Sequence, residues 1–157
     1  IFLMKKEADI PMNKHETEIL VIDGQGGSLG AMLCKLLTSA LPKARIVAVG
    51  TNSIASAAML KAGAHTASTG EYPVVCAAPW ANYIVAPLGA AVPSSLGGEV
   101  TPAMAEAVGR SRAHKFLIPG DSDRCRLHVV GAATPMALSK SASLAVEMIC
   151  EMEKNAG

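Results

Sequence analysis

The sequence predicts an α/β fold in which a mostly parallel sheet lies between two layers of helices. Short apolar runs alternate along the chain with segments of helical pattern, and glycine, proline or capping residues mark the boundaries. The first apolar run, residues 19–23, leads directly into a glycine-rich turn and then a helix. Helices placed between strands require parallel pairing with right-handed crossovers. We therefore expect a three-layer, Rossmann-like sheet with strand order 3-2-1-4-5 and a sixth strand at one edge.

The first half of the chain supplies three strands and two helices. Apolar runs predict strands over 19–23, 45–50 and 64–69. The helices between them are expected over 27–40 and 52–62, where Asn52 or Ser53 is the N-cap and Gly63 the C-cap.

The second half begins with a short segment, 71–81, and a strong strand, 83–86. Thr101-Pro102 has the pattern of a cap followed by a first-turn proline, which predicts a helix to Val108 that Gly109 ends. Strands are then expected at 116–118 and 127–130, the last pair too close for a crossover helix and so antiparallel. Thr134-Pro135 predicts the start of a C-terminal helix that runs to Lys154.

Length and composition fit one domain without a membrane or nucleic-acid surface. The chain has 157 residues, 50% of them hydrophobic, and we expect residues 1–17 to form a loose extension and 18–157 a single domain. A net charge of +1 argues against a nucleic-acid partner. The uncharged stretch 72–98 is broken by prolines, so it is not a membrane helix. The four cysteines lack C-x-x-C spacing, which suggests buried, reduced thiols of a cytoplasmic protein.

The turn Gly24-Gln25-Gly26-Gly27 is the strongest functional signal in the chain. Glycines allow a phosphate to approach the backbone, and the free N–H groups and positive dipole end of the following helix attract it. The pattern departs from the dinucleotide fingerprint, because the third glycine is Gly30 rather than residue 29. It lacks the lysine of a P-loop as well. The alternative is that the glycines only allow a strand to turn tightly into a helix.

The end of the second strand bears on the choice of cofactor. An acidic residue is expected there in NAD-binding sheets, and this chain has the neutral residues Thr51, Asn52 and Ser53. The absence of an acidic residue at the end of this strand favours NADP over NAD, although no arginine lies there to hold a 2′-phosphate.

Ligands of such sheets bind outside the carboxyl ends of the strands, beside the first strand. This rule brings together the turn, the residues after strand two, and a long loop, 88–100, that could fold over them as a lid. The cofactor-binding candidates are Gly24, Gln25, Gly26, Gly27, Ser28, Thr51, Asn52, Ser53 and Gly89.

Three carboxylates are candidates for chemistry, each with a structural alternative. Asp23 could hold a metal or a ribose, or it could cap local N–H groups and repel a nearby pyrophosphate. Glu71 and Glu99 could act as acid and base if they meet across the cleft, but solvated loop carboxylates are commoner. No histidine has metal-ligand spacing, so no metal site is expected. Asn52 and Ser53 could likewise be helix caps that need no ligand.

Several blocks of sequence resemble an uncharacterised bacterial family known as domain of unknown function 3842. The blocks are Ile22 to Gly27, Ala48 to Ala55, Ala58 to Ala64, Thr69 to Glu71, and Gly98 to Ala105. The resemblance covers about residues 19–131 and implies a small Rossmann-like domain. It implies no activity, because the family has none established.

The sequence thus predicts a protein that binds a nucleotide or another phosphorylated metabolite at the glycine turn. As an enzyme it would be an NADP-type oxidoreductase; the alternative is a non-catalytic ligand sensor or a subunit of a larger complex. The C-terminal segment has more apolar residues than one stripe against the sheet requires, Val146 and Ile149 among them. We therefore expect a homodimer with this helix at the interface; the alternative is that these residues pack within one chain.

Overall fold

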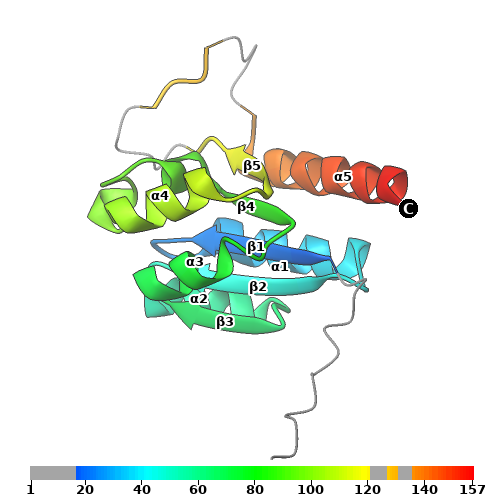
Figure 1. Ribbon diagram of the computed structural model, residues 1–157, viewed down its shortest axis with the longest axis horizontal. Helices are drawn as coiled ribbons and strands as arrows, with labels where there is room; N and C mark the ends of the chain where they lie inside the picture. The colour runs from blue at the N-terminus through cyan, green and yellow to red at the C-terminus, as the bar shows by residue number, and fades with distance from the viewer. Residues whose placement is uncertain (1–16, 121–126, 131–135) are drawn as a thin grey trace, which may run out of the picture.

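The protein forms a single parallel sheet flanked by helices (Figure 1). The structure is a computed structural model, and it describes residues 17–120, 127–130 and 136–157. The strands are β1 (Glu18–Asp23), β2 (Arg45–Gly50), β3 (Thr66–Thr69), β4 (Tyr83–Pro87) and β5 (His114–Ile118). In the described part of the chain they pair in the order β3-β2-β1-β4-β5, all parallel, which confirms the expected fold class and strand order.

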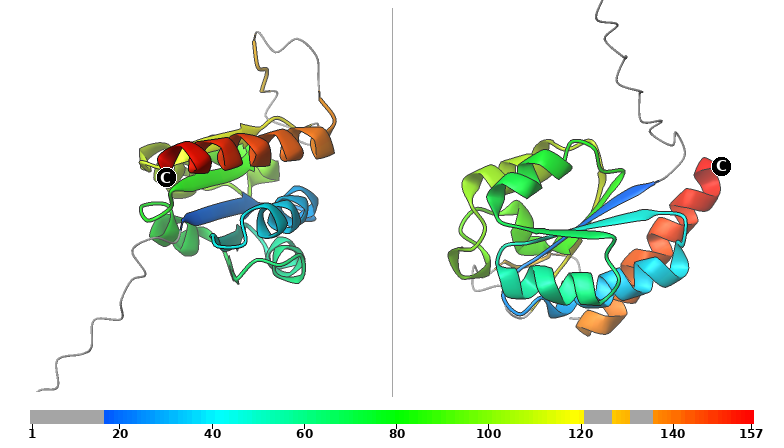
Figure 2. Two further views of the ribbon diagram at one scale, coloured as in Figure 1. Left: turned by 90° about the vertical axis from the view of Figure 1, so that its right-hand side faces the viewer. Right: turned by 90° about the horizontal axis from the view of Figure 1, so that it is seen from below.

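Helices connect the strands and cover both faces of the sheet. They are α1 (Ser28–Ala40), α2 (Ser53–Lys61), α3 (Glu71–Ala77), α4 (Pro102–Arg110) and α5 (Leu138–Ala156), with short 3₁₀ helices η1 (Leu88–Ala91) and η2 (Leu96–Gly98). The view from below shows α1, α2 and α5 on one side of the sheet and α3 and α4 on the other (Figure 2).

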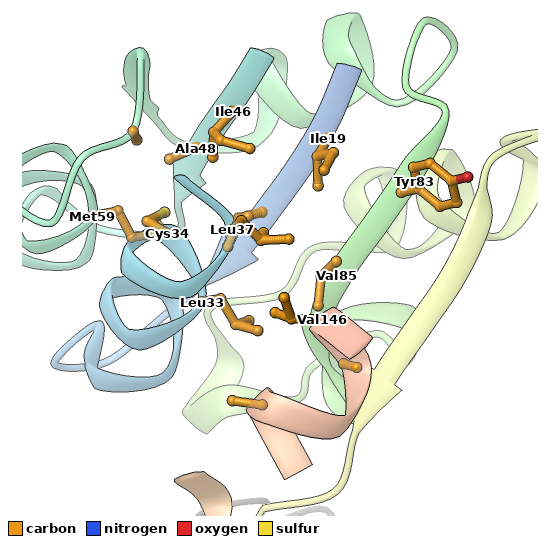
Figure 3. Packing of buried hydrophobic residues seen from close by; sticks show 14 of the residues in the cluster. Ile19, Leu33, Cys34, Leu37, Ile46, Ala48, Met59, Tyr83, Val85 and Val146 are labelled. Carbon is orange, nitrogen blue, oxygen red and sulfur yellow. The ribbon is translucent and has the colours of Figure 1, made fainter. Parts of the chain in front are cut away.

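Each face of the sheet has its own core, because successive side chains of a strand point to opposite faces. Ile19 and Val21 of β1 face one core, and Leu20 and Ile22 face the other. Figure 3 shows the first core, in which α1 and α5 side chains meet those of the central strands. Burial on both faces explains the near-continuous apolar runs of β1 and β4.

The register of the central strands brings their carboxyl ends to one level. Asp23 at the end of β1 pairs with Gly50 at the end of β2, and Val21 pairs with Val85 of β4. The residues that follow β1, β2 and β4 therefore meet at one edge of the sheet, where the candidate site lies.

The structure differs from the sequence prediction in four details. Residues 127–130 form no strand, and Val130 is 97% exposed, so no sixth strand exists there. The segment after Gly70 is helical over Glu71–Ala77, since Pro73 lies in the first turn, where its missing N–H costs nothing. Gly109 lies inside α4 rather than ending it. The last helix begins at Leu138, and the predicted start at Thr134-Pro135 lies outside the described residues.

The N-terminal extension also lies outside the described residues, apart from Thr17, whose carbonyl oxygen accepts a hydrogen bond from the Arg45 N–H.

Cys34 is buried as expected, whereas Cys76 is exposed, and neither cysteine forms a disulfide within the described residues. Across the described ranges, no helix is long and apolar enough to cross a membrane.

Candidate functional site

The glycine turn connects the end of β1 to the start of α1 through two left-handed residues. Gln25 has a φ of 50° and Gly27, the residue before α1, a φ of 73°. The Gly27 N–H donates to the Gly24 carbonyl oxygen at 2.9 Å and closes the turn. The predicted order of strand, glycine turn and helix is therefore present.

Three of the four glycines in this region are required by the protein's own packing. A Cβ atom at Gly24 would lie 2.6 Å from the Thr51 hydroxyl, and one at Gly27 would lie 2.6 Å from Ala55 Cα. At Gly30, which lies in the first turn of α1, a Cβ would lie 2.5 Å from Met59 Sδ and 2.7 Å from Asp23 Cβ. Gly30 thus provides the close helix–strand packing expected of the third fingerprint glycine, one position later in the chain.

Gly26 is different from the other three. It is exposed, a Cβ atom there would meet nothing within 4 Å, and its backbone is not left-handed. Nothing in the surrounding packing requires glycine at this position.

Asp23 acts as an acceptor for the start of α1, as the structural alternative proposed. Its Oδ1 accepts from the Gly24 N–H at 2.8 Å and its Oδ2 from the Gly30 N–H at 2.6 Å. Burial raises the pKa of this carboxyl, and the bonds from Gly30 and Gly24 only partly offset that increase. Asp23 is 6% exposed, so it is a buried cap rather than a free ligand.

Glu99 is the second carboxylate at the turn, and it comes from the loop between β4 and α4. Its Oε2 accepts hydrogen bonds from the Gln25 N–H at 2.9 Å, from the Thr51 hydroxyl, and from Asn52 Nδ2 at 3.2 Å. Partial burial favours the neutral acid, but these three donors together outweigh it and lower the pKa of Glu99. Through Glu99, the loop 88–100 therefore contacts the turn.

The residues after β2 have mainly structural contacts. Asn52 caps α2, since its Oδ1 accepts from the Ala55 N–H at 2.9 Å, and its Nδ2 also donates to the Gln25 carbonyl oxygen at 2.9 Å. The Thr51 N–H donates to the Asp23 carbonyl oxygen at 2.9 Å. Ser53 is the first residue of α2 and is exposed.

A pocket of about 330 Å³ lies beside the turn. The turn forms one wall, from Asp23 to Leu29. The ends of β4 and β5, the helix η2 and the start of α5 form the rest, with the residues Pro87, Leu96, Ile118, Pro119, Gly120, Met136, Ala137 and Leu138. The N–H groups of Gly26 and Ser28 on this wall have no hydrogen-bond partner among the residues that the structure describes. These two groups are free to bind an anion.

Six predicted residues do not line this pocket: Thr51, Asn52, Ser53, Glu71, Gly89 and Glu99. Thr51, Asn52 and Glu99 still reach the turn through the hydrogen bonds described above. Gly89 is buried in η1 and does not line the pocket. Glu71 is exposed at the start of α3, and its side chain has no hydrogen bond or ion pair within the described ranges, so nothing joins it to Glu99. In the same ranges no group of three or more histidine, cysteine or carboxylate side chains could hold a metal ion.

Several pocket residues are not predicted by the sequence pattern. Ile118 ends β5, and ligands of such sheets bind outside the carboxyl ends of the strands, so its place in the pocket could have been predicted. Leu96 lies in the short 3₁₀ helix η2 and Met136 in the segment before α5, and neither position carries such a signal.

These features define a class: an α/β protein of Rossmann-like topology with a strand, glycine turn and helix at the point where the strand order reverses. The chain belongs to the family described as Domain of unknown function (DUF3842), whose model matches residues 18–154. The match confirms the resemblance seen in the sequence and extends it through most of α5. No curated protein matches the chain significantly.

Proposed function

We propose that the protein binds a nucleotide or another phosphorylated metabolite, with a phosphate on the N–H groups of Gly26 and Ser28. The observation that carries this proposal is the pair of free N–H groups on the pocket wall, at the start of the 13-residue helix α1. A helix start combines unpaired donors with the positive end of the dipole, so it favours an anion.

The exposed glycine supports the same proposal. Gly26 has open space where a side chain would be, and the protein's own packing gives no reason for it. A phosphate close to the backbone would give one, because a side chain at residue 26 would occupy the space that the phosphate needs.

The rest of the pocket suits the uncharged part of such a ligand. Pro87, Leu96, Ile118 and Leu138 make its other walls apolar. Small-molecule sites combine a mainly apolar lining with a few fixed polar groups. A dinucleotide would place its pyrophosphate at the turn and its adenosine ribose toward Thr51, so a dinucleotide-dependent oxidoreductase, of the NADP type in the sequence prediction, is the enzyme class that we propose to test.

A non-catalytic ligand sensor or a subunit of a complex is the second candidate. One observation favours it: both oxygens of Asp23, the carboxylate at the end of β1, already accept hydrogen bonds from backbone N–H groups. A general base needs a lone pair directed at the substrate. Binding without chemistry therefore fits this site as well as an oxidoreductase does.

The experiment compares substitutions at two open glycines. Gly26→Val adds a side chain at the proposed phosphate site, and Gly109→Val adds the same side chain to α4, where a Cβ also meets nothing within 4 Å. We expect NADP⁺, NAD⁺ or ADP to raise the melting temperature of the wild type and of Gly109→Val but not of Gly26→Val. A ligand shift that persists in Gly26→Val would place the binding site elsewhere, and native mass spectrometry of the purified protein would show whether it retains a ligand.

A further inference from the structure

The side chain of Glu99 brings a carboxylate to the end of β2, although it belongs to a loop that follows β4. All three of its hydrogen bonds are made by Oε2, with the Gln25 N–H at 2.9 Å, the Thr51 hydroxyl and Asn52 Nδ2 at 3.2 Å. The carboxylate is thus fixed directly over the first residues of the glycine turn and the first residues after β2.

The other oxygen of this carboxylate is free. Oε1 has no partner among the described residues, and Glu99 is only half-buried, so Oε1 faces solvent. The donors that hold Oε2 also favour the ionised form and lower the pKa of Glu99. A negative charge with an unused acceptor therefore stands at this position at neutral pH.

A carboxylate at this position has a known consequence in sheets of this topology. An acidic side chain at the end of the second strand accepts a hydrogen bond from the ribose 2′-hydroxyl and repels a 2′-phosphate. The end of β2 here is neutral, at Thr51, Asn52 and Ser53. Glu99, hydrogen-bonded to Thr51 and Asn52, brings a carboxylate to this end of β2 from another part of the chain.

We propose that Glu99 is the ribose acceptor of this site, so that the site selects nucleotides with a free 2′-hydroxyl over nucleotides with a 2′-phosphate. The inference rests on the proposed nucleotide binding at Gly26 and Ser28. It reverses the preference for NADP expected from the neutral end of β2, because that expectation considered only residues that follow β2 in the chain.

Glu99 also ties the loop to the turn, and this structural role needs to be separated from ligand selection. The tether uses Oε2 alone. A ribose would use Oε1, whereas inorganic pyrophosphate has no ribose and would contact only the turn. Loss of the tether would weaken both kinds of ligand, and loss of the ribose acceptor would weaken only nucleotides.

The experiment measures dissociation constants for NAD⁺, NADP⁺ and inorganic pyrophosphate by isothermal titration calorimetry. Glu99→Gln removes the charge at nearly constant shape, and Glu71→Gln makes the same change at an exposed carboxylate after β3. We expect the wild type and Glu71→Gln to bind NAD⁺ at least about tenfold more tightly than NADP⁺. In Glu99→Gln the two affinities should become nearly equal, while pyrophosphate affinity stays the same or rises.

Four results would overturn the inference, and they differ in what they say about the site. NADP⁺ binding as tight as NAD⁺ in the wild type, or an unchanged ratio in Glu99→Gln, would refute ribose selection but leave nucleotide binding intact. Equal losses of affinity for NAD⁺ and pyrophosphate in Glu99→Gln would show that Glu99 only ties the loop to the turn. If none of the three ligands binds the wild type, the proposed function fails together with the inference.

Discussion

Asp23 is a buried carboxylate whose ionisation the fold opposes. The side chain accepts from the Gly24 and Gly30 N–H groups, but burial still raises its pKa above the usual value of 3.8. Glu99 nearby acts in the same direction through its negative charge. The ionised form of Asp23 is therefore less favourable in the folded protein than in the unfolded chain.

We expect Asp23 to give the stability a specific pH dependence. Because its folded pKa is raised, its favourable contribution is fully present below about pH 3.8 and is lost as the pH rises through the folded pKa. Urea unfolding of the wild type and Asp23→Asn across this range would measure the difference. The difference in free energy of unfolding should change with pH in this direction, and parallel curves would show that Asp23 does not titrate as described.

At the scale of secondary-structure elements, Gly30 determines how closely α1 packs on β1 and α2. A Cβ atom there would lie 2.7 Å from Asp23 Cβ and 2.5 Å from Met59 Sδ. The Met59 side chain can move, but Asp23 Cβ is attached to the central strand β1, so its displacement would cost more free energy. We expect Gly30→Ala to destabilise the fold by about 1–3 kcal/mol, measured by urea unfolding, although alanine favours helix.

Gly109→Ala is the matched control for this prediction. Gly109 lies in α4 and a Cβ there would meet nothing within 4 Å. The same substitution should stabilise the protein there by up to about 1 kcal/mol. If Gly30→Ala and Gly109→Ala stabilise the protein alike, the close approach of α1 to β1 does not require glycine at residue 30.

Local patterns predicted most of the elements, because strand burial and helix caps leave direct marks on the sequence. The strand 45–50 has the observed bounds, and Asn52 and Thr101 are caps. The strand prediction at 127–130 is wrong because Val129 and Val130 are exposed, and β propensity alone does not make a strand. The prediction that Gly109 ends α4 is wrong because a single glycine near a helix end lowers helix stability by only about 1 kcal/mol.

The candidate site was predictable in part. The rule on strand ends correctly grouped the turn with Thr51 and the loop 88–100, since parallel strands end at one edge. The contact between Glu99 and Gln25 joins residues 74 positions apart and leaves no periodic signal. The capping by Asp23 and Asn52 was one of two alternatives that only the hydrogen-bond partners could separate.

Helix α5 has a buried face and an exposed apolar face. Val146 and Ile149, which the sequence analysis placed at a dimer interface, are 6% and 0% exposed and belong to the core. Leu144 and Met148 are 44% and 47% exposed. They line a groove of about 710 Å³ with Phe116 of the edge strand β5.

We expect a homodimer that buries Leu144 and Met148, because exposed methionines and leucines beside an edge strand favour association. Light scattering at micromolar concentration would measure the mass. Leu144→Glu and Met148→Glu should yield monomers, and Leu60→Glu, at a residue of α2 that is 52% exposed, should not. A monomeric wild type, or dimers in all three variants, would contradict this interface.

The proposed function depends on one claim, that a phosphate lies on the N–H groups of Gly26 and Ser28. The most direct test is a titration of the ¹⁵N-labelled protein with ADP, followed through the backbone amide resonances. We predict that the largest changes in chemical shift occur at Gly26 and Ser28, with little change at Gly109 in α4. Saturating ADP that leaves the resonances of the turn unmoved, or whose largest changes lie along the groove beside α5, would contradict the claim.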